Sequence, residues 1–225
     1  MGLTNTKQQG IDGGIKIVVY GPAGVGKTRL MATTPDHSRT LILSAEAGLL
    51  SISEHEIDVW KITSKEDIRE AYRFARANIE RYDWICVDSL SEIAEVVLSH
   101  EKESANDPRR AYGEMADVLF KFVRSMRNLQ SNVIFSSKQE RINDEGRLVY
   151  APMLPGKQLS ANLPYLIDEL WAMRAEVVEG ERRVFLQTQS CALYDAKDRS
   201  GRLRMYERPN LADLANKIIN RNEGA

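Results

Sequence analysis

A glycine-rich octapeptide near the start of the chain has a fixed spacing of glycine, lysine and threonine. It consists of Gly21, Pro22, Ala23, Gly24, Val25, Gly26, Lys27 and Thr28. This is the full phosphate-loop pattern Gly-x-x-x-x-Gly-Lys-Ser/Thr, also called Walker A. An apolar, β-branched run (15–20) precedes it, and a segment with helical character (27–33) follows it. Because a strand and a helix are the flanks that this motif requires, it predicts a nucleotide-binding site rather than an incidental glycine-rich turn.

The residue types of the octapeptide match the chemistry of a triphosphate. Glycines allow backbone conformations that point successive N–H groups inward, which makes a concave site for anions. Lys27 is long enough to reach the β and γ phosphates, and the Thr28 hydroxyl is a ligand for Mg²⁺. The motif therefore predicts Mg²⁺ together with the nucleotide.

An acidic residue directly follows a second buried run. Asp88 comes after Trp-Ile-Cys-Val at 84–87 and fits the Walker B position, which holds the magnesium shell in phosphate-loop enzymes. The alternative is that Asp88 caps the helix that follows, since aspartate is favoured there. Both roles are compatible with the sequence.

Hydrolysis also needs a group that activates water and a group that senses the γ-phosphate. Glu46 lies just past the run 40–43, at the edge of a parallel sheet that opens beside the phosphates, although a surface glutamate is the alternative. Polar residues follow the run 133–135, and the sensor is one of them. They are Ser136, Ser137, Lys138 and Gln139, among which the sequence does not choose.

Short apolar runs alternate with helical patterns up to about residue 138. The runs are 15–20, 40–43, 59–62, 84–87 and 133–135. Their lack of apolar–polar alternation favours an α/β fold with a mainly parallel central sheet flanked by helices. Turn signals at 143–146 and 179–181 then predict antiparallel hairpins on the C-terminal side.

Composition excludes several classes of protein. The 31 basic and 32 acidic residues give a net charge of −1, unlike a histone-like polycation or an acidic tail. Cys86 and Cys191 are too few for a disulfide framework or a zinc site, so a cytoplasmic location is expected. No apolar run approaches the roughly 18–20 residues that span a bilayer, so no membrane association is expected.

The order of these features resembles the RecA-like recombinase core, and Ser-Ala-Glu-Ala at 44–47 looks like the segment in which RecA proteins keep their catalytic glutamate. The C-terminal part resembles more specifically a phage-encoded family of small RecA-like P-loop ATPases. The matching residues are Pro-Gly-Lys at 155–157, Leu-Pro at 163–164, Asp168, and Asp-Ala-Lys-Asp-Arg-Ser-Gly at 195–201. The similarity runs from about residue 14 to 220. Residues 1–14 are polar and glycine-bearing and are expected to form a flexible arm. The resemblance implies one RecA-like ATPase domain (15–220), followed by a tail (221–225).

The resemblance implies further site residues. RecA-like assemblies bind ATP between subunits, and a neighbouring subunit supplies basic residues to the γ-phosphate. Lys197 and Arg199 best match that catalytic role. The alternative is that they belong to a solvated basic loop. RecA proteins also bind single-stranded DNA through loops after the Walker B and sensor strands. In the second loop the candidate DNA contacts are Lys138, Arg141, Arg147 and Lys157, while Tyr150 is a candidate for base stacking.

The function implied by this resemblance is DNA-dependent ATP hydrolysis on single-stranded DNA, in phage homologous recombination or single-strand annealing. The expected cofactors are ATP and Mg²⁺, and the expected partners are single-stranded DNA, further copies of the chain and a single-strand binding protein. If the protein is phage-encoded, it acts in the host cytoplasm. The alternative is a nucleotide-gated loader or scaffold whose turnover DNA does not stimulate.

Overall fold

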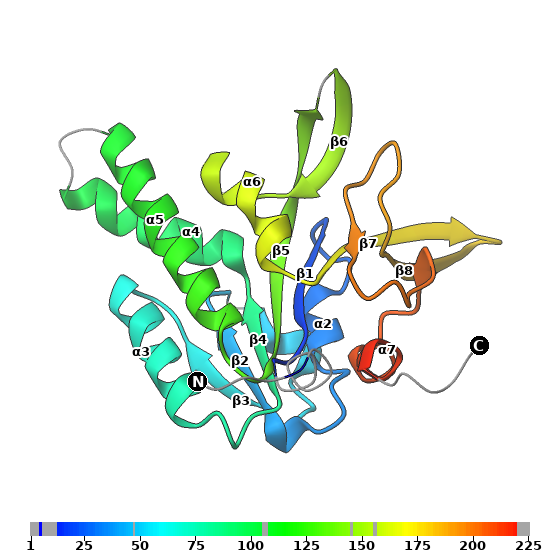
Figure 1. Cartoon of the computed structure of the whole chain (residues 1–225), viewed down its shortest axis with the longest axis horizontal. Coiled ribbons are helices and arrows are strands. Elements are labelled where there is room, and N and C mark those ends of the chain that lie inside the picture. The colour runs from blue at the N-terminus through cyan, green and yellow to red at the C-terminus, as the bar shows by residue number, and fades with distance from the viewer. Residues whose placement is uncertain are drawn as a thin grey trace.

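The computed structural model describes residues 5, 13–46, 48–104, 108–144, 146–154 and 157–219. Most of the predicted arm and all of the predicted tail lie outside these residues. The described part of the chain forms a twisted sheet with helices on both faces (Figure 1). Within it, no helix is both long and apolar enough to cross a membrane.

The sheet strands and helices follow one another in an α/β order. They are β1 (Lys16–Gly21), α2 (Lys27–Met31), η1 (His37–Arg39), β2 (Thr40–Ser44), η2 (Leu49–Ile52), β3 (Asp58–Lys61), α3 (Lys65–Ala77), β4 (Trp84–Asp88), α4 (Leu90–Ser104), α5 (Pro108–Arg127), β5 (Asn132–Asp144), β6 (Arg147–Pro152), α6 (Lys157–Leu166), β7 (Glu169–Val178), β8 (Glu181–Gln187), β9 (Lys197–Asp198), β10 (Tyr206–Glu207) and α7 (Leu211–Ile219).

The central strands are parallel in the order β7-β1-β5-β4-β2-β3. Antiparallel pairing occurs only around them among the described strands: β6 pairs with β5, β8 and β9 pair with β7, and β10 pairs with β8. The predicted α/β fold, a mainly parallel central sheet flanked by helices with antiparallel hairpins on the C-terminal side, is confirmed.

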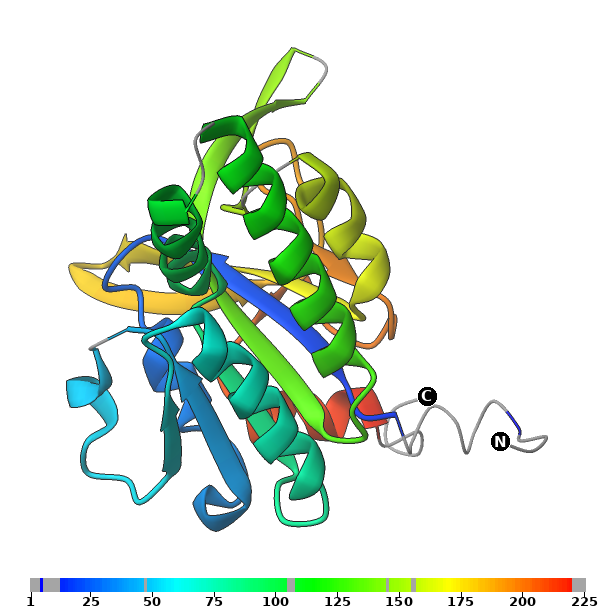
Figure 2. The ribbon, with the colours of Figure 1, turned by 90° about the vertical axis from the view of Figure 1, so that its left-hand side faces the viewer.

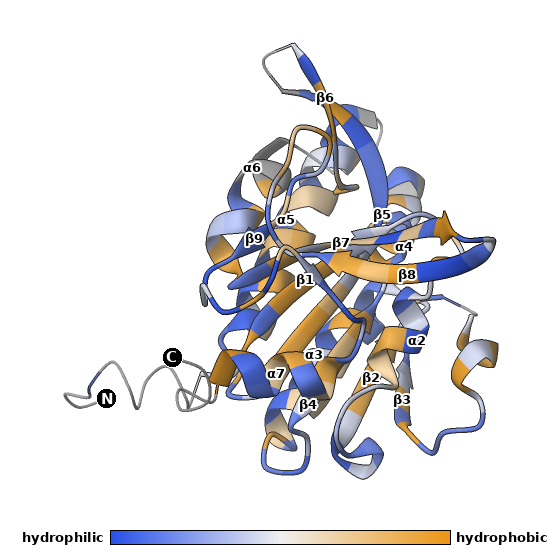
Figure 3. Ribbon diagram, turned by 90° about the vertical axis from the view of Figure 1, so that its right-hand side faces the viewer, coloured by the Kyte–Doolittle hydropathy of each residue, from blue (hydrophilic) through white to orange (hydrophobic). Residues whose placement is uncertain are grey.

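Alternate residues of the central strands point into two separate cores. Val18 and Tyr20 of β1 face the layer formed by α3, α4, α5 and α6, which lies in front in Figure 2. Ile17 and Val19 face the layer that contains α2 and α7, and Figure 3 shows the apolar strands behind those two helices. Because both faces are covered, every residue of β1, β2 and β4 is buried, which explains their continuous apolar sequence.

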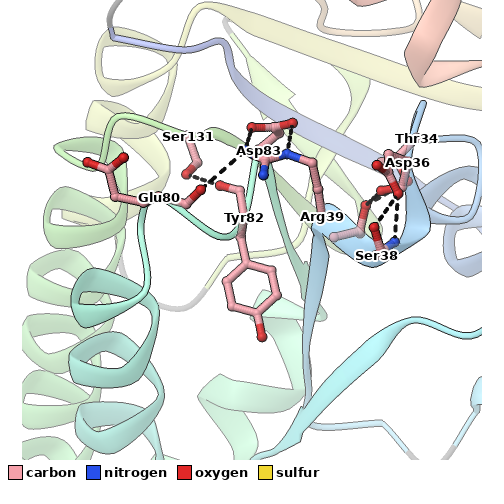
Figure 4. Close-up of polar contacts among 9 residues, drawn as sticks. Thr34, Asp36, Ser38, Arg39, Glu80, Tyr82, Asp83 and Ser131 are labelled. Carbon is pink, nitrogen blue, oxygen red and sulfur yellow. Dashed lines mark hydrogen bonds and ion pairs between the residues drawn. The ribbon is translucent and has the colours of Figure 1, made fainter.

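Polar contacts align the strands at the amino-terminal edge of the sheet (Figure 4). The Arg39 guanidinium before β2 binds both carboxylate oxygens of Asp83 before β4, each at 2.6 Å, and donates to the Glu80 carbonyl at 3.2 Å. Ser131 before β5 donates its hydroxyl to the Tyr82 carbonyl at 2.6 Å. A pocket of ≈ 330 Å³ lies among these residues, on the edge opposite the phosphate loop, and its Arg39–Asp83 pair is mutually neutralised.

The sensor strand is longer than predicted. The apolar run 133–135 is only the buried start of β5, which continues to Asp144 and forms a hairpin with β6 that projects from the sheet (Figure 1). Apart from Ile142 the projecting half is polar, because it pairs with β6 alone and has no second layer to cover it.

Glu169 at the start of β7 is a buried carboxylate beside another carboxylate. Burial, and then the neighbouring Asp198 of β9, raise the pKa of Glu169 from 4.5 to about 8, although Trp171 donates a hydrogen bond to it at 3.3 Å. The folded protein therefore keeps this proton over a pH range in which the unfolded chain has lost it. Since the unfolded state binds fewer protons there, stability falls as the pH rises from about 4.5 to about 8.

Glu169→Gln removes this ionisation and keeps a hydrogen-bonding side chain. The free energy of unfolding of the variant is expected to exceed that of the wild type by on the order of 3–5 kcal/mol at pH 9, and to differ little near pH 4.5. Urea unfolding at pH 4.5, 7 and 9 measures this difference, with Glu70→Gln on the exposed side of α3 as the control. A difference that stays constant with pH would contradict the assignment.

Candidate nucleotide-binding site

The phosphate loop lies between β1 and α2, and two of its glycines cannot be replaced without strain. Gly26 precedes α2 with φ +110°, a left-handed conformation that side chains rarely adopt. Gly21 lies against β7, where an added Cβ would be 2.5 Å from the Met173 carbonyl oxygen. The loop conformation therefore depends on the glycines that the motif specifies.

Three oxygen-bearing side chains from three elements meet beside the loop. Thr28 on α2 donates its hydroxyl to one carboxylate oxygen of Asp88 at 2.7 Å, and Ser136 on β5 donates to the other. Asp88 is only 2% exposed at the end of β4. Hard oxygen ligands of this kind are those that Mg²⁺ prefers, and one carboxylate with one hydroxyl leaves room for phosphate oxygens and water. The donor set therefore fits the predicted magnesium site.

The helix that follows is capped by Ser89 and not by Asp88, which was the alternative role for that aspartate. Ser89 accepts a hydrogen bond from the Glu92 backbone N–H in the first turn of α4, at 3.3 Å. The Asp88 side chain points instead toward Thr28 and Ser136. The peptide bond between Asp88 and Ser89 is cis.

Glu46 lies next to the magnesium-binding residues. Its backbone N–H and that of Ala45 donate to the Asp88 carbonyl, at 3.3 and 2.8 Å, so the turn after β2 is fastened to the end of β4. The Glu46 carboxylate accepts a hydrogen bond from the Ser89 hydroxyl at 2.7 Å, which orients it. The predicted water-activating group is thus within the same cluster as Asp88, not on a separate surface loop.

The ammonium group of Lys27 is held inside the loop by the carbonyls of Gly21 and Pro22, at 2.9 and 3.0 Å. Burial lowers the pKa of Lys27, whereas the carboxylates of Glu46 and Asp88 act in the opposite direction. Lys27 shares its site with Asp88, because Thr28, the next residue, donates its hydroxyl to that carboxylate.

The register of β5 places three of the four sensor candidates. Ser136 faces the α2 side and bonds Asp88, whereas Ser137 faces α4, where it contacts Ser91 at 3.2 Å and donates to the Met153 carbonyl at 3.0 Å. Lys138 pairs in register with Gly21 of β1, so it enters the same site.

Lys138 is surrounded by the acidic residues of that site. It forms an ion pair with Glu92 of α4, which raises the pKa of Lys138, and Glu46 acts in the same direction. Lys138 in turn contributes to lowering the pKa of Lys27. The residue predicted as a DNA contact therefore also lies beside the phosphate loop.

The sequence that forms this site matches a known family. Residues 13–200 match the AAA domain. The chain belongs to that family. It is therefore a P-loop ATPase domain, of a family that generally binds ATP with Mg²⁺.

No curated protein matches this AAA domain. Among solved structures, it is similar to a KaiC-like protein from the hyperthermophilic archaeon Pyrococcus horikoshii, at 14% sequence identity and a TM-score of 0.49. That similarity covers 78% of this chain and 77% of the archaeal one.

The two residues predicted to act on a neighbouring subunit lie far from the phosphate loop of their own AAA domain. Lys197 belongs to β9, which pairs with the start of β7 at the amino-terminal edge of the sheet. Its ammonium group donates to the carbonyls of Pro164 and Ile167. Arg199 binds the Asp168 carboxylate at 2.8 Å. Neither side chain belongs to its own domain's nucleotide site.

The predicted DNA contacts lie mainly on the β5–β6 hairpin. Arg141 and Arg147 are exposed there, and the guanidinium of Arg141 lies 5.2 Å from the centre of the Tyr150 ring. Tyr150 also stacks on Tyr194 at 4.9 Å, so its ring already has partners. The side chain of Lys157 lies outside the described residues, as do Pro155 and Gly156.

Sequence reasoning missed two groups of the site. Ser89 orients Glu46, and its place directly after the Walker B aspartate is the only sequence signal for it. Arg182 of β8 donates a hydrogen bond to the Gly24 carbonyl of the phosphate loop at 3.0 Å. No sequence motif links Arg182 to Gly24, because the two residues are 158 positions apart.

Proposed function

We propose that the protein is a DNA-dependent ATPase that acts on single-stranded DNA in phage homologous recombination or single-strand annealing. The observation that supports this most is the course of β5. It carries Ser136 and Lys138 in the nucleotide site and Arg141 on the projecting hairpin, so one strand joins the candidate sensor to the candidate DNA surface. The sequence resemblance adds the phage origin and, with it, the host cytoplasm.

Each polar group of the site has a role in hydrolysis that its position supports. The loop N–H groups and Lys27 bind the β and γ phosphates. Thr28 and Asp88 would hold Mg²⁺, and a bound Mg²⁺ would supply positive charge to the phosphate oxygens. Glu46 accepts a proton from the attacking water, and Ser89 keeps the carboxylate in place.

The hairpin offers both kinds of contact that single-stranded DNA needs. Arg141 and Arg147 supply positive charge for phosphates, and the exposed side chains of Ile142 and Leu148, 38% and 53% accessible, supply apolar surface for bases. Tyr150 is less suited to stacking than the sequence suggested, because Arg141 and Tyr194 pack on its ring.

Self-association of the chain is part of the proposal. Lys197 and Arg199 lie at the edge of the sheet opposite the phosphate loop, a position from which they could reach only the nucleotide of another copy. Their present contacts with carbonyls and with Asp168 would have to open for that role. A single-strand binding protein is the proposed further partner.

The test is ATP hydrolysis with and without single-stranded DNA, together with DNA binding by fluorescence anisotropy. We expect DNA to raise turnover several-fold in the wild type. The double variant Arg141→Ala/Arg147→Ala is expected to keep the basal rate and lose the stimulation, and its DNA binding should depend less steeply on salt.

The double variant Arg69→Ala/Arg73→Ala on the exposed face of α3 is the charge-matched control and is expected to behave as the wild type. If DNA neither binds nor changes turnover while ATP is still hydrolysed, the recombination proposal fails. The alternative, a nucleotide-gated loader or scaffold, would then account for the ATPase domain.

A further inference from the structure

The β7–β8 hairpin lies directly against the phosphate loop. The carbonyl of Met173 on β7 fills the space where Gly21 would carry a Cβ, and the methyl carbon of Met173 is 3.4 Å from the equivalent position on Gly26. Arg182 on β8 donates from Nη2 to the Gly24 carbonyl at 3.0 Å. Two neighbouring strands thus contact the loop at three of its glycines.

The hydrogen bond from Arg182 fixes the orientation of the Gly24–Val25 peptide in the loop. Among the described residues the only cis peptide bond is Asp88–Ser89, so the Gly24–Val25 peptide is trans, and its C=O and N–H point in opposite directions. The carbonyl points outward to Arg182. The N–H of Val25 therefore points away from the hairpin, and the buried Val25 side chain, 2% exposed, anchors the residue.

Gly24 would not hold this orientation by its own packing. It has φ +68°, and a Cβ placed on it would meet no atom within 4 Å. A glycine in open space is free to rotate its flanking peptides. The hydrogen bond from a charged donor is the restraint that the structure provides at this point of the loop.

We propose that Arg182 is a positioning residue of the nucleotide site. Its guanidinium holds the Gly24–Val25 peptide so that the Val25 N–H faces the phosphates of a bound nucleoside triphosphate, and its charge adds to that of Lys27. This rests on nucleotide binding by the proposed ATPase, but not on its action on DNA. Arg182 contacts only the phosphate loop, so the ligand that this residue serves is defined by its phosphates and not by its base.

The neighbouring arginine provides a matched control. Successive residues of a strand point to opposite faces, so Arg183 faces away from the loop side of Arg182. Arg183 lies 3.7 Å from the Glu179 carboxylate in the hairpin turn. The two residues therefore share a hairpin and a charge but not the contact with Gly24.

The experiment compares Arg182→Gln, Arg182→Lys and Arg183→Gln without DNA. Titration with Mg²⁺ and a non-hydrolysable ATP analogue is expected to show binding about 10-fold weaker for Arg182→Gln, as for the loss of one charged hydrogen bond. Arg182→Lys should recover part of that loss, and Arg183→Gln should bind as the wild type does. In hydrolysis the KM of Arg182→Gln should rise while kcat changes by less than about 3-fold.

A second measurement needs no nucleotide. Amide hydrogen exchange in the loop 22–26 is expected to be faster in Arg182→Gln than in Arg183→Gln, with the thermal unfolding midpoint unchanged in both. Unchanged affinity and exchange in Arg182→Gln, or equal weakening in Arg183→Gln, would overturn the proposal. Loss of DNA stimulation in the wild type would count against the proposed function and leave this result intact, whereas a wild type that binds no nucleotide would overturn both.

Discussion

Lys27→Ala is expected to lower ATP turnover by on the order of 10³-fold. The Lys27 ammonium lies inside the phosphate loop, bonded to the carbonyls of Gly21 and Pro22, with the carboxylates of Glu46 and Asp88 nearby. Removing it leaves those two negative charges facing the phosphates with less positive charge to balance them. The loss should therefore appear in nucleotide affinity as well as in the rate.

Phosphate release measured at saturating ATP, and calorimetric titration with an ATP analogue, give the two effects separately. Lys121→Ala on the exposed side of α5 removes the same charge elsewhere and is expected to match the wild type. Turnover within 10-fold of the wild type for Lys27→Ala would show that hydrolysis takes place at another site, or comes from a contaminant.

Glu46→Gln is expected to lower kcat by about 10²–10⁴-fold while ATP still binds. The amide keeps the size of the side chain and can still accept the Ser89 hydrogen bond, but it cannot take a proton from water. Replacing a carboxylate near Lys27 by a neutral amide also removes negative charge from the phosphates. Nucleotide affinity should consequently stay the same or increase.

Single-turnover hydrolysis with bound ATP measures this step directly. Glu56→Gln, an exposed glutamate ahead of β3, is the control and should not change the rate. If Glu46→Gln hydrolysed ATP at the wild-type rate, the water-activating group would have to be another residue of the site, and Asp88 would be examined next.

The parts of the structure that follow from buried apolar runs could be predicted from the sequence. The central strands are covered on both faces, so continuous apolar runs at 15–20, 40–43 and 84–87 correspond to β1, β2 and β4. Helix α6 could not be predicted in this way, because Pro164 interrupts it and proline normally indicates a helix end.

Site residues that belong to a local sequence motif or directly follow an apolar run could be predicted. Site residues whose position depends on strand register or on tertiary contacts could not. The phosphate loop, Asp88 and Glu46 each follow a strand directly, and the structure brings them together. Choosing Ser136 over Ser137 required the pleat of β5, since adjacent residues face opposite cores. The contact of Arg182 with Gly24 required the tertiary structure itself.

Because β5 is continuous, a small change of its direction at the nucleotide site produces a larger displacement at its far end. Eight residue steps separate Ser136 from the last residue of the strand, Asp144, which corresponds to about 26 Å at the usual rise of a strand. Tilting the strand by about 5° at the magnesium end displaces its far end by about 2 Å. In the proposed function, a small adjustment around a phosphate group would thereby be amplified into a movement large enough to change the contact with single-stranded DNA.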